Sequence, residues 1–90
     1  MEAKDHITLF ISWFNSNVAD GDVPELDDDE VYLVWYNFTL GNSRSLISTT
    51  RPDHKYYEVT HNNNTGEFYV DTYLKVAHKT LPDISILKIA

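Results

Sequence analysis

Acidic side chains crowd into one short part of this sequence. Seven of its fourteen Asp and Glu residues lie between residues 20 and 30, in the run DGDVPELDDDE, which holds no Lys, Arg or His. Carboxylates at this density can hold a cation, attract a basic protein surface, or imitate the phosphates of a nucleic acid. These carboxylates therefore indicate a binding function. The candidate partner-binding carboxylates are Asp20, Asp22, Glu25, Asp27, Asp28, Asp29 and Glu30.

This acidic segment, residues 20–30, allows three interpretations. Charge runs are commonly solvated loops that aid solubility. In extended chain, alternate side chains repeat about every 6.6 Å, close to the spacing of phosphates along one nucleic-acid strand. Such a chain would present Asp27 and Asp29 on one side, and Asp28 and Glu30 on the other. The third interpretation is an oxygen-rich cation loop.

Metal, cofactor and catalytic chemistry are not expected. Asp20-x-Asp22 begins like a calcium-binding EF-hand loop, but Pro24 and the missing Gly break that pattern. The chain has no cysteine, which rules out thiolate sites and disulfides and suits a reducing cytoplasm. Phosphate-loop, GxSxG and HExxH motifs are missing. Metal-ligand spacing is also missing among the histidines, expected at surface or partly buried positions: His6, His54, His61 and His78.

Composition limits the class of protein further. Ninety residues, 42% of them apolar and 13% aromatic, predict one small folded domain over residues 1–90. A net charge of −7 opposes direct binding to nucleic acid or to anionic membranes. The apolar patch Ile7–Phe14 is far too short to span a membrane. A basic protein surface is the partner that this charge favours.

The first segment has the period of an amphipathic helix. Its apolar residues follow the i, i+3, i+4, i+7 spacing of one helical face: Ala3, Ile7, Phe10, Ile11, Phe14 and Val18. Glu2 and Asp5 suit the first turn, where acids complement the helix dipole. The Asn-, Asp- and Gly-rich run from residue 15 to residue 21 predicts its end.

From Glu30 the pattern changes to strands joined by short turns. The predicted strands cover residues 31–40, 44–50 and 55–61, and the turns between them contain Gly, Pro, Asp and Asn. After Gly66 the sequence suits either a strand or a helix. We expect a short strand over Glu67–Val70, then a helix capped by Asp71 and running to about Lys79.

The expected fold is α+β. It is a two-layer sandwich in which an N-terminal and a C-terminal helix pack on a three- to four-stranded antiparallel meander. The apolar tail, residues 83–90, is expected to form an edge strand or to pack on a neighbouring chain. Alternation in the first strand predicts that Tyr32, Tyr36 and Phe38 share one face. Either loops or the tail cover this face, or it is exposed as a protein interface, where Tyr is a favoured anchor. On the second alternative, Tyr32 and Tyr36 join the candidate partner-binding residues.

The β core also resembles a family of small, functionally uncharacterised phage and prophage proteins of Gram-positive bacteria. The likeness covers residues 30–83, and the motifs that carry it are VYLVWY at 31–36, TL at 39–40, STT at 48–50, YYEVT at 56–60 and YVDTYLK at 69–75. The family has a bulkier, more basic stretch where this chain has residues 41–45. The resemblance implies a phage origin and an intracellular setting, and it carries over no functional residue.

Two functions fit these observations. The first is a non-catalytic phage protein that binds and modulates a host protein in the cytoplasm. Its target would be a nuclease, a defence factor or another DNA-handling factor, inhibited by partial nucleic-acid mimicry. The second is a structural or accessory protein that acts as a homo-oligomer. A third and weaker alternative, a small enzyme or ligand-binding module, would need an enclosed pocket.

Overall fold

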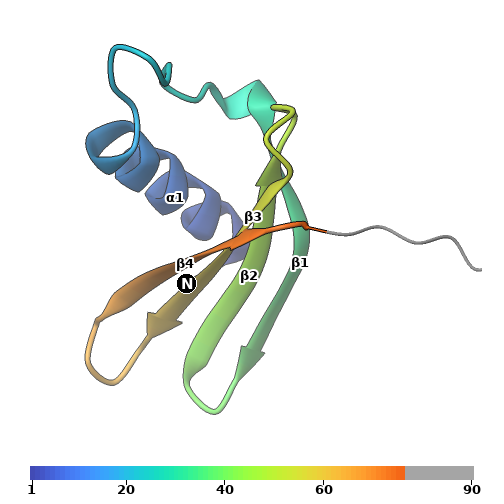
Figure 1. The fold of residues 1–90 in the computed structure, drawn as a ribbon. Helices are drawn as coiled ribbons and strands as arrows, with labels where there is room; N and C mark the ends of the chain where they lie inside the picture. Colours follow the sequence, from blue (N-terminus) through green and yellow to red (C-terminus); the bar gives the residue numbers. More distant parts are fainter. Residues whose placement is uncertain (77–90) are drawn as a thin grey trace, which may run out of the picture.

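The computed structural model describes residues 1–76, which form one helix packed on one face of a four-stranded antiparallel sheet (Figure 1). The strands lie side by side in chain order. A short 3-10 helix, η1, comes just before the first strand. The elements are α1 (Ala3–Asn17), η1 (Asp28–Glu30), β1 (Val31–Thr39), β2 (Asn42–Thr49), β3 (Lys55–Asn62) and β4 (Phe68–Leu74). The predicted α+β class is confirmed.

Helix α1 forms where the apolar period predicted it. The Glu2 amide donates to the Asp5 carboxylate at 2.9 Å, a capping contact that places the acid in the first turn. At the other end, the Val18 amide donates to the Phe14 carbonyl at 2.8 Å. The side chains of α1 that become fully buried lie four residues apart, at positions 6, 10 and 14.

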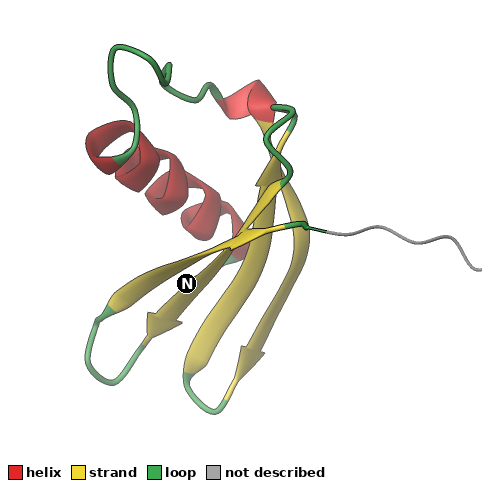
Figure 2. Ribbon diagram, viewed as in Figure 1, coloured by secondary structure: helices red, strands yellow, loops and turns green. Residues whose placement is uncertain are grey.

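The hydrophobic core lies between α1 and the sheet. The Phe10 ring is centred 4.7 Å from the Tyr57 ring, and the Phe14 ring meets the same Tyr57 edge-on at 6.3 Å. Aromatic pairs in these geometries add to the stabilisation from buried area. The opposite face of the sheet is left uncovered by the described residues (Figure 2). The buried hydrophobic residues are Phe10, Phe14, Leu26, Ile47, Tyr57 and Val59.

An irregularity in β1 decides which side chains face α1. The pairing register with β2 shifts between Leu33, which lies opposite Ile47, and Trp35, which lies opposite Leu46. Val34 is therefore the extra residue of a β-bulge, and side chains beyond it point to the other face from the one that strict alternation gives. Ile47 is fully buried against α1, so Leu46 and Trp35 lie on the uncovered face.

The bulge overturns one prediction. Tyr32 precedes it and lies opposite Ser48 on the uncovered face. Tyr36 follows it, lies opposite Ser45, and turns its ring toward His6 on the helix side, with the ring centres 5.4 Å apart. The prediction that Tyr32, Tyr36 and Phe38 share one face is therefore wrong.

The prediction of a C-terminal helix that begins at Asp71 is also wrong. Strand β4 continues to Leu74, and Asp71 pairs with Glu58 of β3 instead of capping a helix. The strand forms here because pairing with β3 runs without a break from residue 68 to residue 74 and satisfies those β4 amides and carbonyls that point toward β3. The rest of that predicted helix, residues 77–79, and the apolar tail at 83–90 lie outside the described residues.

Candidate binding surface

Arg51 organises the acidic segment. Its Nε donates to the Glu30 carboxylate at 3.1 Å, and its Nη atoms donate to the carbonyls of Pro24 and Glu25 at 2.8 and 2.7 Å. Its guanidinium also lies 5.5 Å from the centre of the Phe14 ring. The Arg51 guanidinium beside Glu30 holds the pKa of that carboxyl below its usual value. One cation thus ties the acidic segment to both the sheet and the helix.

Asn15 fixes the middle of the same segment. Its side-chain amide accepts a hydrogen bond from the Leu26 amide at 2.8 Å and donates to the Leu26 carbonyl at 3.2 Å. The Leu26 side chain is buried in the core. Because both backbone groups of Leu26 are satisfied by one side chain, the segment is held against α1.

Three of the seven candidate carboxylates have structural roles, because Asp27 caps η1 in a capping box with Glu30. Glu30 pairs with Arg51 and also accepts from the Asp27 amide at 3.1 Å. Asp20 accepts from the amides of Asp22 and Val23 at 2.7 and 2.8 Å, which closes a turn. Among residues 1–76, no side-chain hydrogen bond or ion pair engages these four exposed carboxylates: Asp22, Glu25, Asp28 and Asp29.

The backbone of the acidic segment does not match a nucleic-acid strand. The spacing argument assumed extended chain at residues 27–30, but Asp28–Glu30 form η1. A 3-10 helix rises about 2 Å per residue and turns its side chains in three directions. The prediction that alternate residues here share a side is therefore wrong.

The uncovered side of the sheet forms an aromatic surface, which we term the open face. Tyr32, Tyr69 and Tyr73 are about half exposed, and Trp35 of β1 is 38% exposed. The register places its members in rows across the four strands. They are Tyr32, Trp35, Asn37 and Thr39 from β1, Asn42, Arg44, Leu46 and Ser48 from β2, Tyr56, Glu58, Thr60 and Asn62 from β3, and Tyr69, Asp71 and Tyr73 from β4.

Two carboxylates face each other within this surface. Glu58 of β3 lies directly opposite Asp71 of β4, and neither has an ion-pair partner among the described residues. Like charges in directly paired strand positions destabilise a sheet. The aromatic rings of Tyr56, Tyr69 and Tyr73 lie on the rows next to them. Carboxylates beside exposed aromatic rings suit a cationic side chain from outside the chain.

A buried polar cluster lies on the opposite, helix-facing side of the sheet. His6 is fully buried, and its Nδ1 and Nε2 lie 2.8 Å from the hydroxyl oxygens of Ser45 and Ser43. Both serines are also fully buried. Burial lowers the pKa of His6, with further lowering from the positive N-terminus and His61, while Asp5 raises it. No solvent-borne substrate can reach these hydroxyls, so the cluster holds α1 on the sheet.

Sequence reasoning missed this cluster, although a signal was present. His6 lies four residues before Phe10 on the buried stripe of α1, and Ser43 and Ser45 alternate along one strand. Among the described residues, no three His, Asp or Glu side chains gather closely enough to hold a metal ion. Within residues 1–76, no helix has the length and hydropathy needed to cross a membrane.

Fold and surface together define a small α+β protein in which one helix covers one face of a four-stranded antiparallel meander and the other face is open. The chain belongs to a family of unknown function, DUF6275, which it matches over residues 3–83. Comparisons with curated proteins and with solved structures give no match. The family description says nothing of origin or location, so the phage setting and the cytoplasmic location stay predictions.

Proposed function

We propose that this protein is a non-catalytic binding protein whose open face and acidic segment together take the basic surface of another protein. The observation that carries this proposal is the Glu58–Asp71 pair. Two carboxylates at directly paired strand positions, beside the exposed Tyr69 and Tyr73, favour a cationic group from a partner between them. The formal charge of −7 attracts such a partner from a distance.

The acidic segment extends the same surface. Asp28 and Asp29 lie in η1, which leads directly into β1 and so to Tyr32 at the near end of the open face. Because Arg51 and Asn15 hold the segment in one arrangement, its free carboxylates are presented without a large ordering cost on binding. Tyr and Trp side chains then supply apolar anchors beside the charge.

In the phage setting that the resemblance implies, the partner is a host protein, and DNA-handling factors carry basic surfaces because they neutralise phosphates with Lys and Arg. Inhibition follows if the occupied surface is the one that such a factor offers to DNA. The proposal depends on total charge and apolar contact, and it does not require carboxylates at phosphate spacing.

Photo-cross-linking from defined positions tests this function. A benzophenone amino acid replaces Tyr69 on the open face or, as a control, the exposed Ser16 on α1. Each labelled protein is irradiated in a host lysate at low and high salt. We expect one basic host protein to join to position 69 and not to position 16, with less product at high salt. Equal labelling from both positions, or adducts only with a second copy of this chain, would count against the proposal.

Charge variants distinguish direct contact at the open face from the long-range attraction that the net charge of the protein produces. Neutralising the open-face pair as Glu58→Gln with Asp71→Asn should reduce the adduct about five-fold, since exposed ion pairs contribute about 0.2–1 kcal/mol each. The matched control is Glu2→Gln with Asp53→Asn, which changes net charge equally at exposed positions off the open face. If both pairs of substitutions act alike, the open face does not make the contact.

A further inference from the structure

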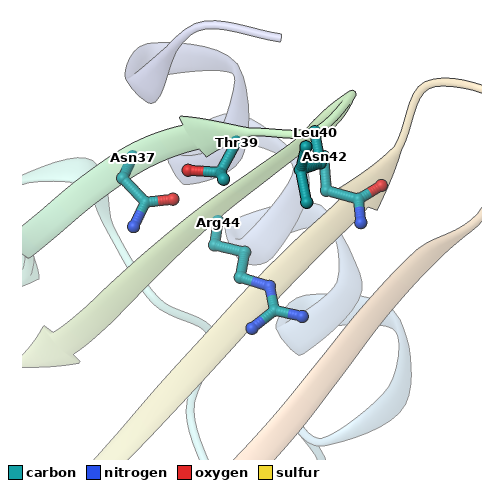
Figure 3. Close-up of a pocket in the computed structure, with 5 residues that line it drawn as sticks. All are labelled: Asn37, Thr39, Leu40, Asn42 and Arg44. Carbon is teal, nitrogen blue, oxygen red and sulfur yellow. The ribbon is translucent and has the colours of Figure 1, made fainter.

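A separate pocket lies on the open face where β1 turns into β2 (Figure 3). It encloses about 340 Å³ and is lined by Asn37, Thr39, Leu40, Asn42 and Arg44. That volume is at the lower end for small-molecule sites and suits a group the size of one or two amino acids. In Figure 3 the side chains of Asn37, Thr39 and Arg44 project from the side of the sheet away from α1. The pocket is thus accessible from solvent.

The charged group of this pocket is a pure hydrogen-bond donor, Arg44, and the Asn and Thr side chains around it both donate and accept. Arg44 brings a planar guanidinium with five N–H groups, and Asn37 and Asn42 each bring an amide NH₂. Directly across the neighbouring strands Arg44 faces Asn37 and Thr60, which are uncharged. Among residues 1–76, Arg44 has no ion-pair partner. A guanidinium without an ion-pair partner matches a planar carboxylate, which it can bind through two parallel hydrogen bonds.

The hairpin turn supplies an apolar wall at a conformational cost. Leu40 has φ +54° and is 93% exposed, and Gly41 follows at φ +80°. A turn with two positive φ angles favours Asn-Gly, whereas a leucine there is strained. The adjoining hairpin braces this turn, because the Asn63 amide donates to the Gly41 carbonyl at 3.1 Å. A strained, exposed leucine lining a pocket of donors provides contact for an apolar group next to the bound carboxylate.

The acidic segment does not prevent anion binding here. Residues 31 to 37 of β1 separate it from the pocket, and a strand of that length measures about 20 Å. The Debye length is about 10 Å at 0.1 M salt, so the acidic charge is largely screened at the pocket. Glu58 lies closer, diagonal to Arg44 across the strand pair. Its neutralisation should therefore tighten anion binding slightly.

We infer that this pocket binds a carboxylate carried by an apolar group, such as the C-terminus or an acidic side chain of a peptide. The inference does not depend on the proposed function, since it concerns Arg44 and small anions, whereas the proposed function concerns Glu58, Asp71 and basic proteins. Failure of either therefore leaves the other standing.

Amide chemical shifts of the ¹⁵N-labelled full chain test the inference with small probes at constant ionic strength. N-acetyl-leucine should move the amides of residues 37–44 saturably, with a dissociation constant of about 1 mM. N-acetyl-leucinamide, which has the same shape but no carboxylate, should bind at least ten-fold more weakly. No saturable shift with N-acetyl-leucine, or equal binding of the two probes, would overturn the inference. Inorganic phosphate binding more tightly than N-acetyl-leucine would overturn the assignment to a carboxylate.

Two variants distinguish binding from folding. Arg44 is exposed, so the Arg44→Gln variant should fold normally. Its affinity for N-acetyl-leucine should fall at least ten-fold. Leu40→Asn should raise the melting temperature, because Asn accepts a positive φ, and yet weaken binding about three-fold through loss of the apolar wall. Retained affinity in Arg44→Gln would refute the role of the guanidinium. Unchanged affinity in Leu40→Asn would refute the role of the wall.

Discussion

The buried cluster of His6, Ser43 and Ser45 allows a prediction with a defined magnitude. Replacing His6 by Ala removes two hydrogen bonds of 2.8 Å and leaves two fully buried hydroxyls without their partner. Each lost bond costs about 1 kcal/mol, and the space left by the ring adds about 2 kcal/mol. His6→Ala should therefore lower the free energy of unfolding by about 4 kcal/mol. That is a large share of the 5–15 kcal/mol typical of small domains.

A triple variant isolates the polar component. His6→Leu with Ser43→Ala and Ser45→Ala removes every member of the cluster while keeping similar volume. Because the substitutions leave no member of the cluster without its hydrogen-bond partner, this variant should lie within about 1.5 kcal/mol of the native protein. Urea unfolding followed by tryptophan fluorescence measures all three proteins. A triple variant as unstable as His6→Ala would refute the reasoning from hydrogen bonding.

The same comparison has a pH dependence whose sign is fixed by burial. The pKa of His6 is lowered in the folded state, so the unfolded chain takes up a proton that the folded protein refuses. The contribution of neutral His6 to the free energy of unfolding is fully present above the pKa of His6 in the unfolded chain. It falls as pH drops from there toward the lowered pKa of the folded state, by up to about 1.4 kcal/mol per pH unit. The native protein should lose more stability between pH 7 and pH 5 than the triple variant. Equal slopes would contradict this account.

Three further changes test the contacts around the acidic segment and the hairpin. Arg51→Ala removes the hydrogen bonds to two loop carbonyls and should cost about 2 kcal/mol in urea unfolding, with Arg51→Lys recovering only part. Because the pKa of Glu30 is lowered, the benefit of its pairing is lost as pH falls through that lowered value, so the difference between the native and Arg51→Ala stabilities should narrow in acid to the part that the carbonyl hydrogen bonds supply. Asn15→Ala frees both backbone groups of Leu26 and should raise hydrogen exchange at its amide by at least ten-fold, which mass spectrometry or NMR would detect. Gly41→Ala places a Cβ at φ +80° and should lower the melting temperature by several degrees in calorimetry.

Local sequence patterns predicted most of the fold. The 3.6-residue spacing of Phe10 and Phe14 predicted α1, and β-branched and aromatic runs between turn residues predicted β1, β2 and β3. The β4 segment failed because its apolar residues fit both periods, and pairing with β3 decided between them. The bulge at Val34 could not be predicted, since it depends on how many residues of β1 face each residue of β2.

The candidate binding surface, too, could be predicted from the sequence only in part. The sequence identified the acidic residues, but it could not distinguish the structural Glu30 from the free Asp28 and Asp29. That distinction depends on Arg51, which is 21 positions from Glu30 along the chain. The Glu58–Asp71 pair depends likewise on strand register. Side-chain identity is local information, whereas the neighbours that neutralise or isolate a charge come from the fold.

The bulge in β1 also affects how the molecule meets copies of itself. Strand β1 is an outer strand of nine residues, VYLVWYNFT, without a single charged side chain. A long uncharged edge is a template on which further strands can add, which leads to aggregation. The extra residue at Val34 breaks the regular run of backbone donors and acceptors and increases the local twist. The irregularity thus shortens the segment of the β1 edge that is open to an intruding strand, next to the exposed aromatic surface of the open face.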